Sequence, residues 1–333
     1  MLRWFGKFSL LPLTMEASWP VSVIEPTDDW LYDMRHNQFR QCQFVVTHKL
    51  ANAPTCVNCQ SECECYLKSG RDQSRNQLPY GWQCTNCDCK QVFNFLDASF
   101  IPVRGIGLFK HIQLLYKFYC RRTAKDAAKE MKIGYGTAKV WFDFYRRCIS
   151  HYMQHYFYPN FEFDIDAALE FDEAKSSAKQ KYNVGRAKEP VWVLGGIQRR
   201  SRYVILKVVD NNRNGPLLQS IISSYTAVGS TVITDGWSAY LGLSGLGYYH
   251  WTVKHSEGFV NTMHGHHTNN IENLWMDMLG VLRAAREVQA KHLQKWLDVF
   301  AFRQNMSKAP EGVWARMCCV IGVVQRFVDK PSR

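Results

Sequence analysis

Hydrophobic and polar positions follow two different patterns along this chain. From Leu108, apolar residues recur every three or four positions, as at Ile112, Leu115 and Phe118, which is typical of helices that bury one face. After residue 160 the apolar residues form short runs separated by polar turns, which is typical of strands. From Leu108 onward, the chain is therefore expected to form a helical part followed by a part that mixes strands and helices.

A helix-turn-helix is expected in the helical part. One helix spans residues 123–131 and the next begins near Thr137, with a glycine-containing turn between them. The second helix should turn Val140, Trp141 and Phe144 inward. In a DNA-binding helix-turn-helix this helix enters the major groove.

Three basic residues of the second helix are candidate contacts to DNA phosphates or bases: Lys139, Arg146 and Arg147. An ordinary helical hairpin with a solvated basic face has the same sequence pattern, and the sequence leaves that alternative open.

The mixed part predicts an α/β fold with a mixed sheet flanked by helices. Strands are expected at 169–173, 191–197 and 203–209, with the last two joined as a hairpin through residues 199–202. A helix at 217–225, a strand at 231–235, and helices at 269–287 and 292–302 follow. This order of strand, hairpin, helix, strand and helix is what such a sheet requires.

Composition adds an expectation about partners. The chain has 333 residues, is 46% hydrophobic and carries a formal net charge of +12. A folded, basic protein with an estimated pI of 9.1 is expected to bind a polyanion such as nucleic acid, although charge alone also fits a basic protein without such a partner. No apolar run reaches the roughly 18 residues of a membrane span, so no membrane partner is expected.

Cysteines concentrate in one segment. Eight of the 12 lie between Cys42 and Cys89, which in a large basic protein indicates metal binding. The pairs Cys56/Cys59 and Cys84/Cys87 each have Cys-x-x-Cys spacing, and two such pairs close a tetrahedral structural zinc site. The ligand set stays open, because one of Cys63, Cys65 and Cys89 can replace a member.

Three carboxylates occupy positions that an α/β core exposes. Asp172 and Asp235 lie at strand ends, and Glu272 lies in the first turns of a helix. Carboxylates so placed can hold two Mg²⁺ ions that activate a nucleophile and stabilise the leaving oxygen in displacement at phosphorus. Each residue taken singly also fits a turn, a cap or a helix-dipole contact.

The sequence around each carboxylate resembles Merlin-type DNA transposases, eukaryotic relatives of a bacterial insertion-sequence family. The first block is Leu169-Glu-Phe-Asp-Glu-Ala-Lys175, with residues 181–186 and 192–197 after it. The second is Val232-Ile-Thr-Asp-Gly-Trp-Ser-Ala-Tyr240, followed by residues 253–260. The third is His267-Thr-Asn-Asn-Ile-Glu-Asn-Leu-Trp275. The similarity runs through most of residues 50–305.

This resemblance implies an RNase H-like DDE core in which Asp172, Asp235 and Glu272 bind two Mg²⁺ or Mn²⁺ ions. It implies cleavage at the terminal inverted repeats of a transposon and strand transfer into target DNA. A homo-oligomer would hold two double-stranded ends together, in the nucleus if the organism is eukaryotic. The zinc ribbon and helix-turn-helix would recognise those ends.

Other residues of the third block are assigned supporting roles. The resemblance extends to His267, and Asn269 is a candidate for orienting Glu272 or contacting substrate. His264 and His266 are expected in a polar loop leading into the block rather than at a metal.

The chain departs from the family pattern in two places. Ser176-Ser-Ala178 stands where the family has a Phe-Gly pair, and Leu279 stands where it has a lysine seven residues after the glutamate. Arg283 and Arg286 lie on roughly that side of the helix and can replace the missing cation. A derivative that binds DNA without cutting it is therefore the alternative to an active transposase, and a non-transposing nuclease is a third hypothesis.

The expected organisation has five parts. Residues 1–50 form an unassigned N-terminal region, in which Met15 is a candidate start, and 51–97 form a zinc ribbon. Residues 98–150 form the helix-turn-helix region, 160–305 the RNase H-like core and 306–333 a C-terminal tail.

Overall fold

The computed structural model describes residues 26–48, 50–51, 53–68, 78–96, 99, 101, 106–176, 191–209, 213–253, 267–285 and 288–328. Contacts divide these residues into two compact units. One lies within Tyr152–Ala309, and the other lies within Ser18–His151 and Pro310–Arg333.

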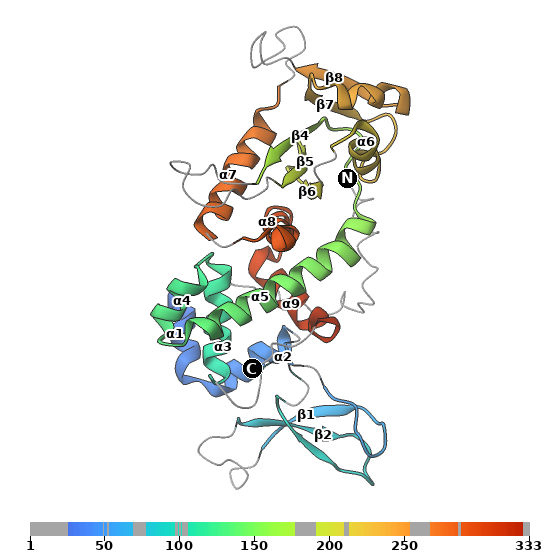
Figure 1. Cartoon of the computed structure of the whole chain (residues 1–333). Helices are drawn as coiled ribbons and strands as arrows, with labels where there is room; N and C mark the ends of the chain where they lie inside the picture. Colours follow the sequence, from blue (N-terminus) through green and yellow to red (C-terminus); the bar gives the residue numbers. More distant parts are fainter. Residues whose placement is uncertain are drawn as a thin grey trace. The chain divides into compact units, whose positions relative to one another are not determined.

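The first unit is built on a five-stranded mixed sheet with the strand order β6-β5-β4-β7-β8 (Figure 1). Strand β5 (Trp192–Gln198) is antiparallel to both β4 (Leu169–Lys175) and β6 (Val204–Val209). Strands β7 (Thr231–Asp235) and β8 (Tyr249–Val253) continue the sheet parallel to β4. This topology is consistent with the expected RNase H-like domain, and the hairpin through residues 199–202 is confirmed.

Helices flank this sheet. Helix α7 (Asn269–Ala285) packs against β4 and β5, and α8 (Leu293–Met306) packs against β6. Helix α6 (Gly215–Ser223) packs against the 3₁₀ segment η5 (Ser238–Leu246), which also contacts β8. Shorter helical turns are η2 (Met153–Phe157), η3 (Tyr158–Asn160) and η7 (Ala290–His292). The core holds the apolar side chains of the strands, such as Phe171, Leu194 and Ile233.

Two amide side chains of α8 bind the open edge of β6. The Asn305 side chain accepts a hydrogen bond from the N–H of Val204 (2.8 Å) and donates one to its carbonyl (2.9 Å). Gln294 does the same for the N–H of Val208 (2.8 Å) and the carbonyl of Leu206 (3.0 Å). Backbone groups that would be left unpaired at a sheet edge are thereby satisfied.

The second unit combines helices with a small antiparallel sheet. Its helices are α1 (Asp28–His36), α2 (Gln38–Thr47), α3 (Leu108–Tyr119), α4 (Ala124–Met131), α5 (Tyr135–Tyr152), α9 (Gly312–Val324) and the 3₁₀ turn η8 (Gln325–Phe327). The sheet is β1-β2-β3, formed by Cys63–Leu67, Tyr80–Cys84 and Val92–Asn94.

The segment expected as a C-terminal tail contains a buried helix. Trp314 of α9 lies in an aromatic cluster, with its ring centroid 5.9 Å from those of Trp30 and Phe44 and 5.2 Å from that of Tyr119. Apolar area removed from water is the main stabilising term in folding. The two ends of the chain therefore contribute to one core, which no local sequence pattern indicated.

Helices α4 and α5 follow one another at the positions where the helix-turn-helix is expected. The hydroxyl oxygen of Thr123 accepts a hydrogen bond from the N–H of Asp126 (3.1 Å) and so caps α4. Lys132 then adopts a left-handed conformation (φ 52°), which ends the helix. Trp141 and Phe144 are buried as predicted, but Val140 is 39% exposed and does not point inward.

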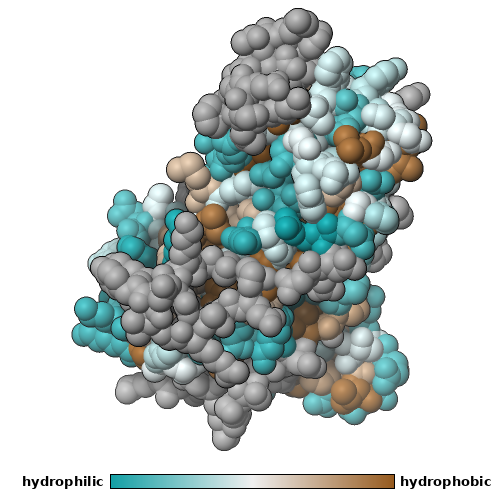
Figure 2. Space-filling view, turned by 45° about the horizontal axis from the view of Figure 1, so that its top comes forward, coloured by the Kyte–Doolittle hydropathy of each residue, from teal (hydrophilic) through white to brown (hydrophobic). Residues whose placement is uncertain are grey.

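Exposed apolar side chains are dispersed over many elements, for example Tyr32, Val57, Val228, Leu241 and Met276. The face drawn in Figure 2 accordingly shows hydrophilic and hydrophobic residues intermixed in its described parts. Within the described residues, the search for a helix with the length and apolar character of a bilayer span gave none.

Candidate active site and metal centre

Asp172 and Asp235 lie on neighbouring parallel strands at equivalent positions. The register pairs Glu170 of β4 with Ile233 of β7. Two residues further along each strand, Asp172 and Asp235 therefore point to the same face of the sheet. Both side chains are half-buried. The sheet thus places two carboxylates on one of its faces, near its carboxyl edge.

The carboxylates are oriented by hydrogen bonds. The indole Nε1 of Trp275 donates to Oδ2 of Asp172 (2.9 Å), and the backbone N–H of Trp237 donates to Oδ1 of Asp235 (3.0 Å). The hydroxyl of Thr268 donates to Oε1 of Glu272 (3.2 Å). Because Trp275 lies one turn after Glu272 on α7, its contact with Asp172 brings that face of the helix toward β4.

A fourth carboxylate, Glu170, fixes the start of α7. It is fully buried, and its Oε2 accepts hydrogen bonds from the backbone N–H groups of Asn270 and Ile271, both at 3.0 Å. Its Oε1 accepts from the side chains of Arg199 (2.8 Å) and Asn270 (2.7 Å). A carboxylate at a helix N-terminus is stabilised by the unpaired N–H groups and by the helix dipole.

Arg199 ties this network together. Besides its ion pair with Glu170, it donates to the carbonyl of His267, so the chain entering α7 is held at two points. Sequence reasoning missed Glu170, although its position two residues before Asp172 puts both on one face of β4. That alternation was the signal available in the sequence.

Gly195 on β5 makes room for this arrangement. It pairs with Asp172 across the strands, and a Cβ atom at position 195 would overlap the indole of Trp275. Only a residue without a side chain lets Trp275 reach Asp172 over the face of β5.

Glu173 points to the opposite face of β4. Burial is the main cause that raises its pKa to about 7; the carboxylates of Asp172 and Asp235 also raise it, while Tyr240 and Arg213 lower it. Burial likewise raises the pKa of Tyr240 well above its usual value, and Glu173, Asp172 and Asp235 add to that shift. Acidic side chains therefore lie on both faces of this part of the sheet.

The donor set of Asp172, Asp235 and Glu272 suits hard cations that prefer oxygen. Among the described residues, the group whose candidate ligand atoms all lie within 4.8 Å of one another consists of cysteines, and the three carboxylates do not form such a group. A pair of ions about 3.5–4 Å apart spreads its ligands over a longer distance than one ion does.

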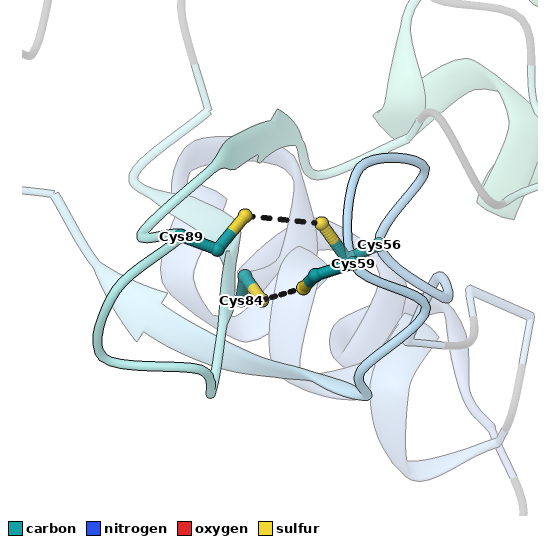
Figure 3. A group of neighbouring side chains, drawn as sticks. All are labelled: Cys56, Cys59, Cys84 and Cys89. Carbon is teal, nitrogen blue, oxygen red and sulfur yellow. Dashed lines mark hydrogen bonds between the residues drawn. The ribbon is translucent and has the colours of Figure 1, made fainter.

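Four cysteines of the second unit do form a compact group: Cys56, Cys59, Cys84 and Cys89 (Figure 3). The sulfur atoms of Cys56 and Cys89 lie 3.5 Å apart, and those of Cys59 and Cys84 lie 3.4 Å apart. Four thiolates around a zinc ion at about 2.3 Å have sulfur–sulfur distances of about 3.8 Å, whereas a disulfide has about 2.05 Å. The cysteine cluster has the dimensions of a tetrahedral zinc site.

The geometry departs from the expected ligand set at one position, because Cys89 and not Cys87 joins the cluster. Cys87 is exposed and lies outside it. The sequence had left Cys89 open as a replacement, but it had also left open Cys63 and Cys65, which lie outside the cluster as well.

The reason is the size of the second loop. The N–H of Cys56 bonds to the carbonyl of Ser61 (2.8 Å), and the N–H of Cys84 bonds to that of Gln91 (2.8 Å). In each loop the second cysteine of the cluster lies two residues before the residue whose carbonyl closes the loop. This cysteine also directly precedes a residue with a left-handed backbone, Gln60 (φ 62°) or Lys90 (φ 48°). The second loop is longer by two residues, so Cys89 takes the place equivalent to Cys59.

The environment of the cluster favours a thiolate at one ligand. Hydrogen bonds from Ser61 are the main cause that lowers the pKa of Cys59 to about 6, whereas burial is the main cause that raises the pKa of Cys84 to about 12. A bound cation would favour the thiolate form at every ligand.

The basic residues predicted to contact DNA differ in their surroundings. Lys139 is exposed on α5. Arg146 instead packs over the rings of Phe118 and Phe142, and burial lowers its pKa to about 10. Arg147 forms an ion pair with Asp143 (3.2 Å) and lies over Phe144. Both arginines therefore serve the packing of α5, because their long stems cover apolar surface.

The candidate residues on α7 and just before it also differ in their surroundings. Arg283 is exposed on α7, and Asn269 is exposed at its first residue. The next residue, Asn270, contacts Glu170 and Arg202 through its side chain. His267 lies 3.6 Å from Glu170, measured from Nδ1 to Oε1. Arg286, His264 and His266 lie outside the described residues.

Residues 166–305 match the family model described as the ISXO2-like transposase domain. The match includes the five-stranded sheet, α7 and most of α8, and it supports a DDE transposase family for this segment. No curated protein matches the chain.

Proposed function

We propose that this protein is a DNA transposase in which Asp172, Asp235 and Glu272 carry metal-dependent cleavage and joining of phosphodiesters. One observation supports this most directly. The three residues lie inside the segment that matches the transposase domain, and the register of β4 and β7 aligns the two aspartates on the face where α7 packs. The Merlin-type assignment is part of the same proposal.

The proposed site would hold two divalent ions, Mg²⁺ or Mn²⁺, on these carboxylates. Bound ions would activate the attacking oxygen and stabilise the leaving oxygen. The protein contributes orientation, because Trp275, Thr268 and the backbone of Trp237 each donate a hydrogen bond to one carboxylate. Glu170 keeps α7, and therefore Glu272, in place against β4.

Double-stranded DNA, at the terminal inverted repeats and in the target, is the proposed substrate. The net charge of +12 favours a polyanion. Lys139 and Val140 are exposed near the start of α5, the helix that would enter the major groove. With Arg146 and Arg147 occupied by packing, Lys139 remains the proposed phosphate contact of that set. Arg283 is a proposed contact on α7. A homo-oligomer that holds two ends, and action in the nucleus of a eukaryotic cell, belong to this proposal.

Cleavage of a labelled duplex that carries the end of the element encoding this chain tests the catalytic proposal. Wild type with Mg²⁺ or Mn²⁺ should nick at the element end, and Asp235→Asn should abolish nicking. Asp277→Asn is the matched control, because Asp277 is exposed on α7 away from the site. Equal cleavage by wild type and Asp235→Asn would refute the assignment, and cleavage without strand transfer would favour a nuclease.

A DNA-binding derivative without catalysis is the second candidate. Leu279 favours it, because this half-buried residue of α7 stands where the resemblance implies a lysine. Binding of the element end by wild type, with no metal-dependent cleavage, would support this candidate. In either case Lys139→Ala should weaken duplex binding without changing the melting temperature.

A further inference from the structure

A guanidinium group is held between two indole rings at the carboxyl edge of the sheet. The Cζ atom of Arg213 lies 3.3 Å from the ring centroid of Trp192 and 4.8 Å from that of Trp237. The ammonium of Lys175 lies 4.9 Å from the ring of Trp192 on the same strand pair. We call these four residues the cation–indole ledge: Lys175, Trp192, Arg213 and Trp237.

The ledge adjoins the carboxylates. Trp237 follows β7 directly, and its backbone N–H donates to Asp235 (3.0 Å). Trp192 pairs with Lys175, three residues beyond Asp172 on β4. Arg213 also acts electrostatically on Glu173, as do Asp172 and Asp235. The ledge and the proposed catalytic carboxylates therefore share one end of the sheet.

The guanidinium of Arg213 lies over two indole rings. An arginine that stacks on aromatic faces keeps its five N–H donors in the plane of the group, where they can still form hydrogen bonds. Within the part of the chain that the structure describes, no hydrogen bond or ion pair to this group is found. A surface arginine normally loses side-chain freedom when it binds, but the indoles have already restricted this one.

A fixed planar donor set of this kind matches a phosphodiester. Arginine binds phosphate oxygens through two parallel N–H···O bonds, and such charge-assisted bonds are stronger than neutral ones. Indole rings beside cations are also typical of surfaces that follow a nucleic-acid backbone. Lys175 adds a second positive charge at the same edge.

We propose that Arg213, clamped by Trp192 and Trp237, binds a backbone phosphate of the DNA strand that enters the carboxylate site. Arg213 is a positioning residue, and the assignment rests on the proposed function. It goes beyond that function by naming the group that holds the substrate strand at the sheet edge.

The experiment compares wild type with Arg213→Gln in metal-free binding to the element-end duplex at several salt concentrations. Loss of one phosphate contact should weaken binding about tenfold and reduce the slope of log K against log[salt] by about 0.9. Arg200→Gln is the control, since it removes an exposed positive charge at the opposite end of β5; it should change affinity less than about twofold.

Substrates with single neutral methylphosphonates locate the contact. One position near the cleavage site should weaken wild type but leave Arg213→Gln unchanged, and Arg213→Lys should recover only part of the affinity because the fork is lost. The proposal is overturned if Arg213→Gln behaves as Arg200→Gln does, or if every methylphosphonate affects both proteins equally. If Arg213→Gln fails to fold, the same binding comparison is made between wild type and Arg213→Lys. Cleavage by wild type is scored separately, so failure of the proposed catalysis is distinguishable from failure of this contact.

Discussion

The cysteine cluster and the carboxylate site are built in opposite ways. The four cysteines come from two loops that are each closed by their own backbone hydrogen bonds, and their thiols approach one another with little else between them. The carboxylates come from two strands and a helix that are far apart in sequence, and each is oriented by a separate donor. A bound ion would stabilise the cysteine cluster, whereas the carboxylates are held by the surrounding protein.

The difference follows from the energetics of each region. The small β1-β2-β3 sheet buries few apolar residues, so a metal ion bound by its cysteines would add to its folding free energy. The five-stranded sheet has a large apolar core, and the carboxylates near its edge are each held by a hydrogen-bond donor of the protein.

The largest effect is expected from removing a cysteine of the cluster. Cys89→Ser should lose the zinc ion and unfold the β1-β2-β3 region, because structural zinc contributes about 10–16 kcal/mol in small peptides. Cys87→Ser should keep about one zinc per chain. Elemental analysis and limited proteolysis of both variants check this. Zinc loss in Cys87→Ser, with zinc retained in Cys89→Ser, would reverse the assignment of the fourth ligand.

The next effect is expected from Glu170. Glu170→Ala leaves Arg199 and two backbone N–H groups without their buried partner, which should lower the free energy of unfolding by about 3–5 kcal/mol. Glu272→Ala should lower it by less than about 1 kcal/mol, since Glu272 is only half-buried. Urea unfolding measures both, and cleavage should be lost in both. Equal stability losses would show that Glu170 does not organise α7.

A smaller effect is expected at Gly195. Gly195→Ala forces its methyl group against Trp275 and should lower the free energy of unfolding by about 1–3 kcal/mol. The control is Gly280→Ala on α7, where a methyl group meets nothing within 4 Å and should stabilise by about 0.5–1 kcal/mol. Thermal unfolding of both variants tests the pair. A neutral Gly195→Ala would mean that Trp275 does not pack on β5.

The smallest effect is a pH dependence from Glu173. Its pKa is raised from 4.5 to about 7 in the folded state, so the folded protein binds more protons than the unfolded chain between these values. Stability is then present in full below pH 4.5 and is lost as pH rises through about 7. Wild type should lose on the order of 1–2 kcal/mol relative to Glu173→Gln between pH 5 and 8, after allowance for solvent screening.

Urea unfolding at both pH values, without divalent metal, measures this difference. Asp277→Asn removes an exposed carboxylate of α7 and should not change it. A Glu173→Gln variant that follows wild type at both pH values would show that Glu173 ionises normally.

Local patterns were sufficient for the regular elements around the site. Runs such as 191–197 and 203–209 predicted a hairpin, and β5 and β6 form one, because strands with a buried face carry their pattern in neighbouring residues. Asp172 and Asp235 were expected at strand ends for the same reason, and they lie on β4 and β7. Strand β8 and helices α1, α2 and α9 were not predicted as elements, because their stability comes from tertiary partners.

Charge was the least reliable guide to exposure. Arg146 was expected to contact DNA, yet it packs over Phe118 and Phe142. A helical residue's direction depends on which face the neighbouring helices cover, and α3 covers that face of α5. Asn270 was not singled out from the sequence, because its partner Glu170 lies 100 residues away in the chain.

The sequence by itself determined the α/β order of elements and the concentration of cysteines, because these depend on residue type and short spacings, and it singled out the three carboxylates as candidates. Only the tertiary structure decided that Cys89 joins the cluster, that Glu170 and Gly195 seat α7, and that Arg213 lies between two indoles. Each of these depends on atoms brought together from distant segments, and their positions follow from loop closure and packing rather than from any local pattern.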